Sequence, residues 1–160
     1  MEGKIRTREE LKKEIDALRR AGKKIVFTNG CFDLLHWGHT TYLREAKKLG
    51  DVLVLGLNSD ASVRAIKGDN RPLTPERERA EVMASLESVD FVTVFGEETP
   101  RELIEYLRPD ILVKGGDWAP GAVAGGDSVR KRGGEVIIIP LVENSSTSRI
   151  IEKILKIHEK

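Results

Sequence analysis

Five short runs rich in Val, Ile and Leu, spread along the whole chain, restrict its possible fold more than any other feature. The runs are nearly continuous in apolar residues and do not alternate with polar ones. This pattern is typical of parallel strands, which are buried on both faces of their sheet. We therefore expect five parallel strands, at residues 24–28, 52–57, 91–95, 111–114 and 136–140.

Helical patterns separate these runs and carry their own start and stop signals. Thr7 and Glu10 form a capping-box pattern, and Thr99 with Glu102 forms a second one. Other helices are expected over about 38–49, after Asn58-Ser59-Asp60, after Thr74-Pro75 and from about Ser146. The last of these is expected to turn four apolar side chains inward: Ile150, Ile151, Ile154 and Leu155.

Strands and helices that alternate in this order predict a doubly wound, Rossmann-like α/β fold with a five-stranded parallel sheet. The chain has 160 residues, so we expect a single domain over 1–160, in which 1–22 forms an N-terminal helical arm. In such sheets, ligands bind beyond the carboxyl ends of the strands. The residues that follow each strand are therefore the first candidates for a functional site.

Charge and cysteine content exclude several classes of protein. The 27 Lys and Arg residues nearly balance 26 Asp and Glu, which argues against a general nucleic-acid binder. No apolar run approaches the roughly 18–20 residues of a membrane span, so no membrane partner is expected. The single cysteine, Cys31, excludes an internal disulfide and a multi-cysteine zinc site, and it fits a reducing, cytoplasmic location.

The segment that follows the first expected strand carries the clearest chemical pattern. Gly30 permits a tight turn and close approach of a ligand, and helix onset near Gly38 provides free backbone N–H groups that suit a phosphate. His36 and His39 are three residues apart, so both rings can face one side of that first turn. A zinc site is the alternative for this pair, but the chain offers no second pair of ligands. Asp33 could simply cap a turn.

The segment GCFDLLHWGH resembles the Gly-x-Phe-Asp-x-x-His-x-Gly-His motif of the cytidylyltransferase-like nucleotidyltransferases, which carry the His-x-Gly-His element. Members of this family join a nucleoside triphosphate to a phosphorylated small molecule and release pyrophosphate. The similarity extends from about residue 24 to 154. It includes Ser145-Ser146-Thr147-Ser148, which resembles the family's Ile-Ser-Thr-Thr motif with Ser145 in place of Ile and Ser148 in place of the second Thr.

The resemblance implies roles for particular residues. It implies catalytic roles for His36, His39, Lys67 and Arg79. The expected nucleotide contacts are Gly30, Cys31, Phe32, Gly38, Gly115, Asp117, Ser146, Thr147, Ser148 and Arg149. The expected substrate contacts are Asp33, Lys67 and Trp118, although Trp118 could instead cover the core and Ser146 could act only as a helix cap. No protein-bound metal is expected, and Mg²⁺ is expected to arrive with the triphosphate.

Within the family, the chain is most similar to the adenylyltransferases of bacterial ADP-heptose synthesis. This similarity implies transfer of AMP from ATP to D-glycero-β-D-manno-heptose 1-phosphate, giving ADP-heptose and pyrophosphate for the lipopolysaccharide core. It also implies a homodimer, and a heptose kinase on a separate chain because 160 residues leave no room for one.

Two alternatives remain open from the sequence. Glycerol-3-phosphate cytidylyltransferases share Phe-Asp-Leu-Leu-His-Trp-Gly-His, but they usually carry Arg where this chain has Leu141 and Met where it has Lys114. A nucleotide sensor without catalytic activity could be built on the same sheet. Release of pyrophosphate would distinguish an enzyme from a sensor.

Overall fold

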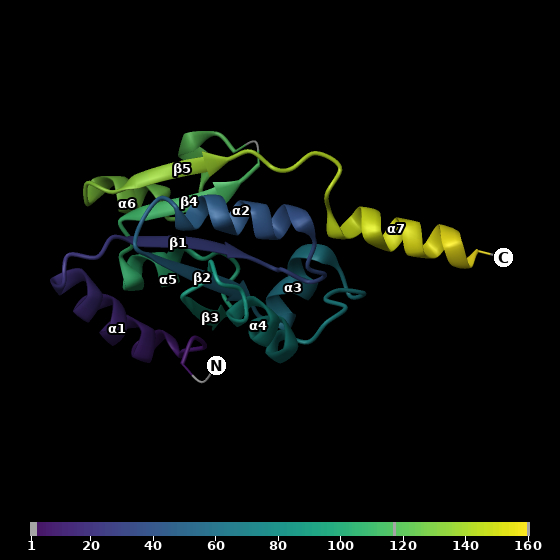
Figure 1. The fold of residues 1–160 in the computed structure, drawn as a ribbon, viewed down its shortest axis with the longest axis horizontal. Coiled ribbons are helices and arrows are strands. Elements are labelled where there is room, and N and C mark those ends of the chain that lie inside the picture. Colours follow the sequence, from purple (N-terminus) through teal and green to yellow (C-terminus); the bar gives the residue numbers. More distant parts are fainter. Residues whose placement is uncertain (1–2, 117, 160) are drawn as a thin grey trace.

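A computed structural model describes residues 3–116 and 118–159 of the chain. Its centre is a sheet of five parallel strands in the order β3-β2-β1-β4-β5 (Figure 1). The strands are β1 (Ile25–Gly30), β2 (Val52–Asn58), β3 (Phe91–Phe95), β4 (Ile111–Gly115) and β5 (Glu135–Ile139). All five expected strands are confirmed, with bounds that differ by at most two residues from the prediction.

Helices cover both faces of the sheet, so the fold has three layers. Their bounds are α1 (Arg8–Arg20), α2 (Trp37–Lys47), α3 (Asp60–Lys67), α4 (Glu76–Ala84), α5 (Arg101–Leu107), α6 (Gly126–Lys131) and α7 (Thr147–His158), with a short 3₁₀ helix η1 (Pro120–Ala122). One apolar cluster joins α2 and α4 to one face of the sheet. A second cluster joins α1, α5 and α6 to the other face. The doubly wound α/β architecture is therefore confirmed.

The N-terminal helix α1 packs against the sheet of its own chain. Leu11 and Ile15 are fully buried in the same cluster as Phe27 of β1 and Leu103 of α5. Thr7 caps α1 as expected, because its side chain accepts a hydrogen bond from Glu10 N while the Glu10 carboxylate accepts one from Thr7 N. Part of the stability of the fold therefore comes from the residues expected as an arm.

The second expected capping box does not form. The helix α5 begins after Pro100 and has no side-chain cap, and Thr99 Oγ1 accepts only a 3.4 Å hydrogen bond from Arg101 N. Proline lacks an N–H group and fixes the backbone at the start of the helix, so the box geometry is not needed there. The sequence pattern also missed α6 and η1, which are short elements that contain glycine.

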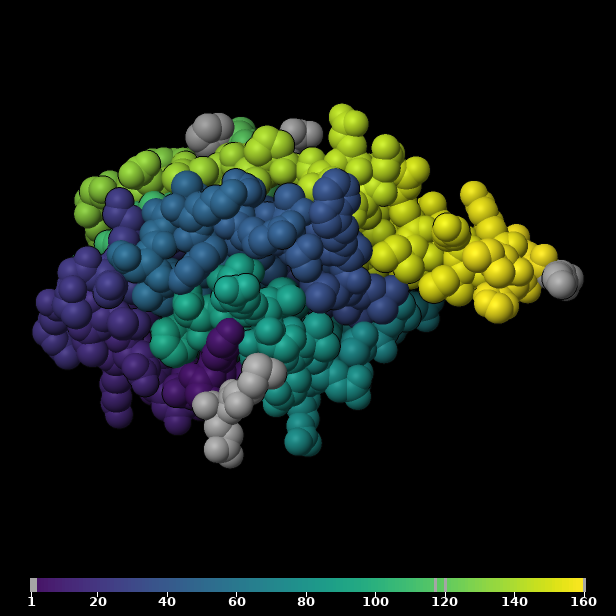
Figure 2. All heavy atoms as spheres, viewed as in Figure 1, coloured from purple at the N-terminus to yellow at the C-terminus, as the bar shows by residue number. Residues whose placement is uncertain are grey.

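The orientation of α7 differs from the prediction. Ile154 and Leu155, which were expected to face the core, are 48% and 57% exposed, and Ile150 and Ile151 are only half-buried. Figures 1 and 2 show the helix projecting away from the body of the molecule. The amphipathic spacing is real, but periodicity alone does not show whether the fold provides a surface for the apolar face to pack against. In the part of the chain that the structure describes, no helix has the length and apolar character that crossing a membrane requires.

Candidate active site

A cavity of about 780 Å³ opens at the edge of the sheet where the strands have their carboxyl ends. The ends of all five strands, or the loops that follow them, contribute to its lining. Asn29 and Asn58 come from the ends of β1 and β2, and Lys114 comes from the end of β4. Glu98 follows β3, and Leu141 follows β5. This is the edge at which an open parallel sheet binds its ligands.

The two histidines predicted from the sequence meet in this cavity. His36 has an extended backbone and is the residue directly before α2, while His39 lies in the first turn of that helix. Their rings are stacked, with centroids 3.8 Å apart and planes inclined by 25°. Gly38 makes this stacking possible, because a Cβ atom there would lie 3.0 Å from both the His36 ring and Ser145 Oγ. The Gly in the His-x-Gly-His pattern therefore has a steric reason.

Both imidazoles are held in the neutral form near pH 7. Burial lowers the pKa of His36. Burial, together with the neighbouring His36 ring, lowers the pKa of His39 to about 4. His39 Nδ1 is buried and has no hydrogen-bond partner among the described residues. Each neutral ring carries a single N–H donor, so the pair can offer directed hydrogen bonds to an anion without full positive charges of its own.

Ser145 fixes His36 from the loop before α7. Its hydroxyl lies 2.9 Å from His36 Nδ1 and accepts a hydrogen bond of 3.1 Å from Gly38 N. Thr147 donates to the carbonyl oxygen of Leu34 at 3.1 Å, and Ser146 caps α7 by accepting from Arg149 N. The serine-rich segment therefore attaches the start of α7 to the start of α2.

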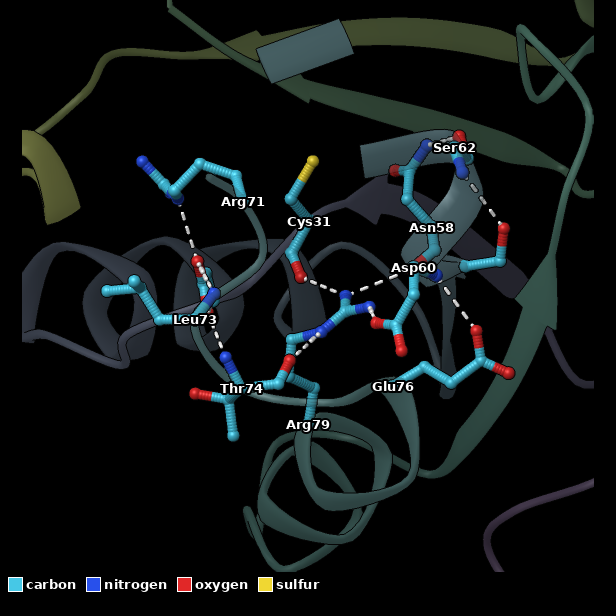
Figure 3. A network of polar contacts seen from close by, with 11 residues as sticks. Cys31, Asn58, Asp60, Ser62, Arg71, Leu73, Thr74, Glu76 and Arg79 are labelled. Atoms are coloured by element: carbon cyan, nitrogen blue, oxygen red, sulfur yellow. Dashed lines mark hydrogen bonds and ion pairs between the residues drawn. The ribbon is translucent and has the colours of Figure 1, made fainter. Parts of the chain in front are cut away.

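Arg79 is placed differently from the other predicted catalytic residues. Its side chain is completely buried beneath the cavity and does not line it. The guanidinium donates to Thr74 O at 2.9 Å, Cys31 O at 2.6 Å, Asn58 O at 2.9 Å and Asp60 Oδ1 at 2.8 Å (Figure 3). These four acceptors belong to the loop after β1, to the junction where β2 ends and α3 begins, and to the segment before α4. Arg79 therefore ties together three segments that border the site.

Asp33 also links separate segments, because it connects the loop after β1 to residues 71–74. Its buried carboxylate accepts hydrogen bonds from Leu73 N at 2.8 Å and Thr74 N at 3.0 Å, and it forms an ion pair with Arg71 Nε at 2.8 Å. Burial alone would raise the pKa of Asp33, but these backbone N–H groups and Arg71 lower it overall. The turn-capping alternative named for Asp33 accounts for these contacts.

Two lysines supply the unpaired positive charge of the cavity. Lys67 ends α3, and Lys114 lies on β4; among the described residues neither has a carboxylate within 4.0 Å. Burial raises the pKa of Cys31, although Lys67, Arg79, Arg71 and Lys114 all act on its thiol in the opposite direction. Cys31 therefore marks a point on which positive charge converges from several elements.

Most of the predicted site residues lie together. The lining includes all of the following: Gly30, Cys31, Phe32, Asp33, His36, Gly38, His39, Lys67, Gly115, Trp118, Ser146, Thr147 and Ser148. Arg79 is excluded from it by burial. Arg149 is exposed, bonds to Asn144 and borders a shallower neighbouring groove. Asp117 lies outside the described residues.

Several lining residues were not predicted as site residues. Lys114 is the last side chain before the two glycines that end β4, so its place at a strand end was a usable signal. Tyr42 lies on α2, and its hydroxyl is 2.6 Å from Thr28 Oγ1. The segments 98–100 and 122–124 come from loops whose approach to the site depends on how the chain packs, and no local pattern indicates it.

The described residues include no cluster of metal ligands at the site. No group of three or more His, Cys, Asp or Glu side chains among them could hold an ion, and the stacked His36 and His39 form only a pair.

Comparison with known proteins gives a consistent result. A family model described as cytidylyltransferase-like matches residues 27–153. The chain is 58% identical over 158 residues to the bifunctional protein HldE of Syntrophotalea carbinolica, and 52% identical over 155 residues to that of Geobacter sulfurreducens. These matches cover 99% and 97% of this chain but 32% of each relative, so the chain spans about a third of their length.

Solved structures give the same fold. A lipopolysaccharide core biosynthesis protein from Thermoplasma volcanium superposes with a TM-score of 0.63 at 29% identity, covering 78% of this chain and all of that one. A pantoate-beta-alanine ligase from Francisella tularensis, solved with an ATP analogue and beta-alanine, superposes with a TM-score of 0.58 at 15% identity. That match covers 98% of this chain and 78% of the ligase, and at this identity it supports the fold alone.

Proposed function

The chain belongs to the cytidylyltransferase-like family, and from that membership we propose that it transfers AMP from ATP to a sugar 1-phosphate, with release of pyrophosphate. The observation that carries the proposal is the cavity itself. It combines a stacked, neutral histidine pair at the start of α2 with two unpaired lysines that come from β4 and from the end of α3. This arrangement suits a ligand with several phosphate groups.

The proposed reaction needs positioning and charge more than it needs a base. A phosphate oxygen of the acceptor, already ionised at pH 7, attacks the α-phosphorus of ATP, and the bond to the leaving pyrophosphate breaks. Catalysis then comes from alignment and from stabilisation of the charge on the transferring phosphoryl group. His36 and His39 donate N–H groups to its oxygens, and the positive end of the α2 helix dipole adds to the same field.

We propose that Ser145 selects the tautomer of His36, because Ser145 Oγ already accepts from Gly38 N and its hydroxyl hydrogen can be donated to Nδ1. When the serine hydroxyl donates to Nδ1, the neutral ring must carry its hydrogen on Nε2. That nitrogen is then the donor available to substrate. In this proposal Ser145, which replaces the Ile of the family motif, is a positioning residue that orients the His36 ring.

The buried polar residues take supporting roles. Arg79 and Asp33 hold the loops after β1 and β2 and the segment 71–74 in place, and their donors and acceptors are already engaged with protein. We assign direct substrate contact to Lys67, and nucleotide contact to the loop after β4 with Gly115 and Trp118 and to Ser146, Thr147 and Ser148.

Family members generally use ATP with a divalent metal, and we propose Mg²⁺ here. Bound to the triphosphate, it would neutralise part of the charge of the leaving group. In this proposal the triphosphate itself supplies most of the ligands of that ion, since the described residues offer no group of three or more His, Cys, Asp or Glu side chains that could hold it.

The acceptor that we propose is D-glycero-β-D-manno-heptose 1-phosphate, which makes ADP-heptose the product. Two comparisons support this choice: the 52–58% identity to bifunctional HldE proteins and the likeness to a solved lipopolysaccharide core biosynthesis protein. In addition, Leu141 lines the cavity where the glycerol-3-phosphate enzymes usually carry Arg. We further propose that a kinase activity supplies the acceptor, that the protein acts as a homodimer, and that it works in the cytoplasm, where the free thiol of Cys31 would remain reduced.

Pyrophosphate release tests the proposal directly. ATP and CTP are each combined with heptose 1-phosphate and with glycerol 3-phosphate, in the presence of Mg²⁺. The expected result is that ATP with heptose 1-phosphate is fastest by at least 100-fold. Faster turnover of CTP with glycerol 3-phosphate would refute the assignment of both substrates. Nucleotide binding without pyrophosphate from any pair would indicate a sensor.

A further inference from the structure

The order of the strands places Lys114 at a special point of the sheet. The chain runs from β1 to β2 and β3 on one side, then returns to place β4 and β5 on the other side of β1. The crevice between β1 and β4 is therefore the point where the winding reverses, and doubly wound sheets bind nucleotides in such a crevice. Lys114 lies near the carboxyl end of β4, beside this crevice, and it lines the cavity.

The surroundings of Lys114 leave its charge without an anion. Lys114 is half-buried. Among the described residues, the only aromatic ring near its Nζ is that of Trp118, whose centroid lies 5.4 Å away. Among the described residues, no carboxylate lies within ion-pair distance of it. A partly buried ammonium group without a counter-charge is unfavourable unless a ligand provides one.

Other cations of the site cannot take the place of Lys114. Arg71 is paired with Asp33, and the buried guanidinium of Arg79 already donates four hydrogen bonds to protein oxygens. Lys67 lies at the end of α3, which follows β2 on the opposite side of β1. Lys67, Lys114 and Cys31 line the same cavity, and the two lysines come from elements on opposite sides of β1.

We propose that Lys114 binds the α-phosphate of the nucleotide and that, with Lys67, it forms a two-sided clamp around the reacting phosphorus. This inference rests on the proposed nucleotidyl transfer and adds a residue to it. We assign Lys114 to the α-phosphate because the glycines directly after it belong to the loop proposed to hold the nucleotide. Since charge on the transferring group is redistributed in the transition state, the contact should influence kcat more than KM.

Lys114→Met keeps most of the side-chain volume and removes only the charge, whereas Lys114→Arg keeps the charge and the contact with Trp118. In steady-state pyrophosphate release, Lys114→Met should lower kcat by about 100-fold or more, a typical loss for one electrostatic donor at a reacting centre. Lys114→Arg should retain most of the activity. Lys48→Met, which removes a lysine from an exposed pair with Glu45, is the matched control and should be unchanged.

The pH profile separates a contact from a packing role. Burial lowers the pKa of Lys114, so the wild-type kcat/KM should fall at alkaline pH sooner than an ordinary lysine would allow. In Lys114→Arg this alkaline limb should move to higher pH, because a guanidinium remains charged there. The Cys31 thiol acts electrostatically on Lys114, but it is present in both proteins and cancels in the comparison.

Binding of inorganic tripolyphosphate, measured by calorimetry, gives a readout that does not require turnover. Lys114→Met should bind it at least 5-fold more weakly than the wild type. Unchanged binding, with kcat within 3-fold of wild type, would overturn the inference and leave Lys114 as a packing residue. If the wild type binds tripolyphosphate through Lys114 but releases no pyrophosphate, the proposed function fails, and only the phosphate contact of Lys114 stands. If Lys114→Met does not fold, as judged by thermal melting, Lys114→Gln takes its place in the same measurements.

Discussion

Replacing Arg79 by methionine would remove the guanidinium that holds three loops together under the site. The side chain is fully buried and donates four hydrogen bonds, three to backbone carbonyls and one to Asp60. Asp60 is partly exposed and can be rehydrated, but the bond to Asn58 O is completely buried. Loss of one partner from a buried, hydrogen-bonded charge pair costs about 3–5 kcal/mol. We expect a loss of that size for Arg79→Met, a large share of the roughly 5–15 kcal/mol that stabilises a typical domain.

Urea unfolding at pH 7 measures this loss, with Arg77→Met as the control. Arg77 lies on the same helix but is exposed, so its replacement should change the free energy of unfolding by less than about 0.5 kcal/mol. Arg79→Lys can still reach some of the acceptors and should recover part of the stability. At a temperature where Arg79→Met is still folded, turnover should also be reduced, because the loops after β1 and β2 lose their common anchor.

One result would refute this reasoning. If Arg79→Met is as stable as Arg77→Met and yet loses turnover, then Arg79 acts on the substrate. The catalytic role implied by the family resemblance would then hold, and the placement beneath the cavity would not describe the working enzyme.

Two further predictions concern the histidine pair. Ser145→Ala should lower kcat about 5- to 10-fold with little change in KM, since it removes one hydrogen bond, worth roughly 1 kcal/mol, that orients His36; an unchanged kcat would show that His36 needs no such support. The pKa of His39 is about 4 in the folded protein and near 6.5 in the unfolded chain, so the unfolded chain binds more protons between these two pH values. The free energy of unfolding should therefore fall as the pH drops from about 6.5 to about 4. Urea midpoints measured across that window should show a shallower fall for His39→Asn, and an equal fall would mean that other groups are responsible.

The sequence was most informative where local pattern decides structure. Near-continuous apolar runs identified all five strands, because parallel strands that are covered on both faces of the sheet consist mostly of apolar residues. The His36 and His39 pair could be placed because helix spacing fixes which side chains share a face. The projection of α7 could not be predicted, since Ile154 and Leu155 show the same periodicity whether or not a surface covers them. The lining by residues 98–100 and 122–124 depends on contacts between loops that are distant in sequence.

The charged residues show most clearly the difference between what a local sequence pattern predicts and what three-dimensional packing decides. Arg79 and Asp33 match the family pattern at the level of sequence, but their neighbours in space use up their hydrogen-bonding capacity, so their part in the site is to hold it. Lys114 carries no comparable pattern, yet the described part of the chain provides no carboxylate partner for it beside the crevice between β1 and β4. A net charge of +1 says nothing about this difference. What separates a binding cation from a structural one is whether the fold has already supplied its anion, and only the assembled sheet reveals that.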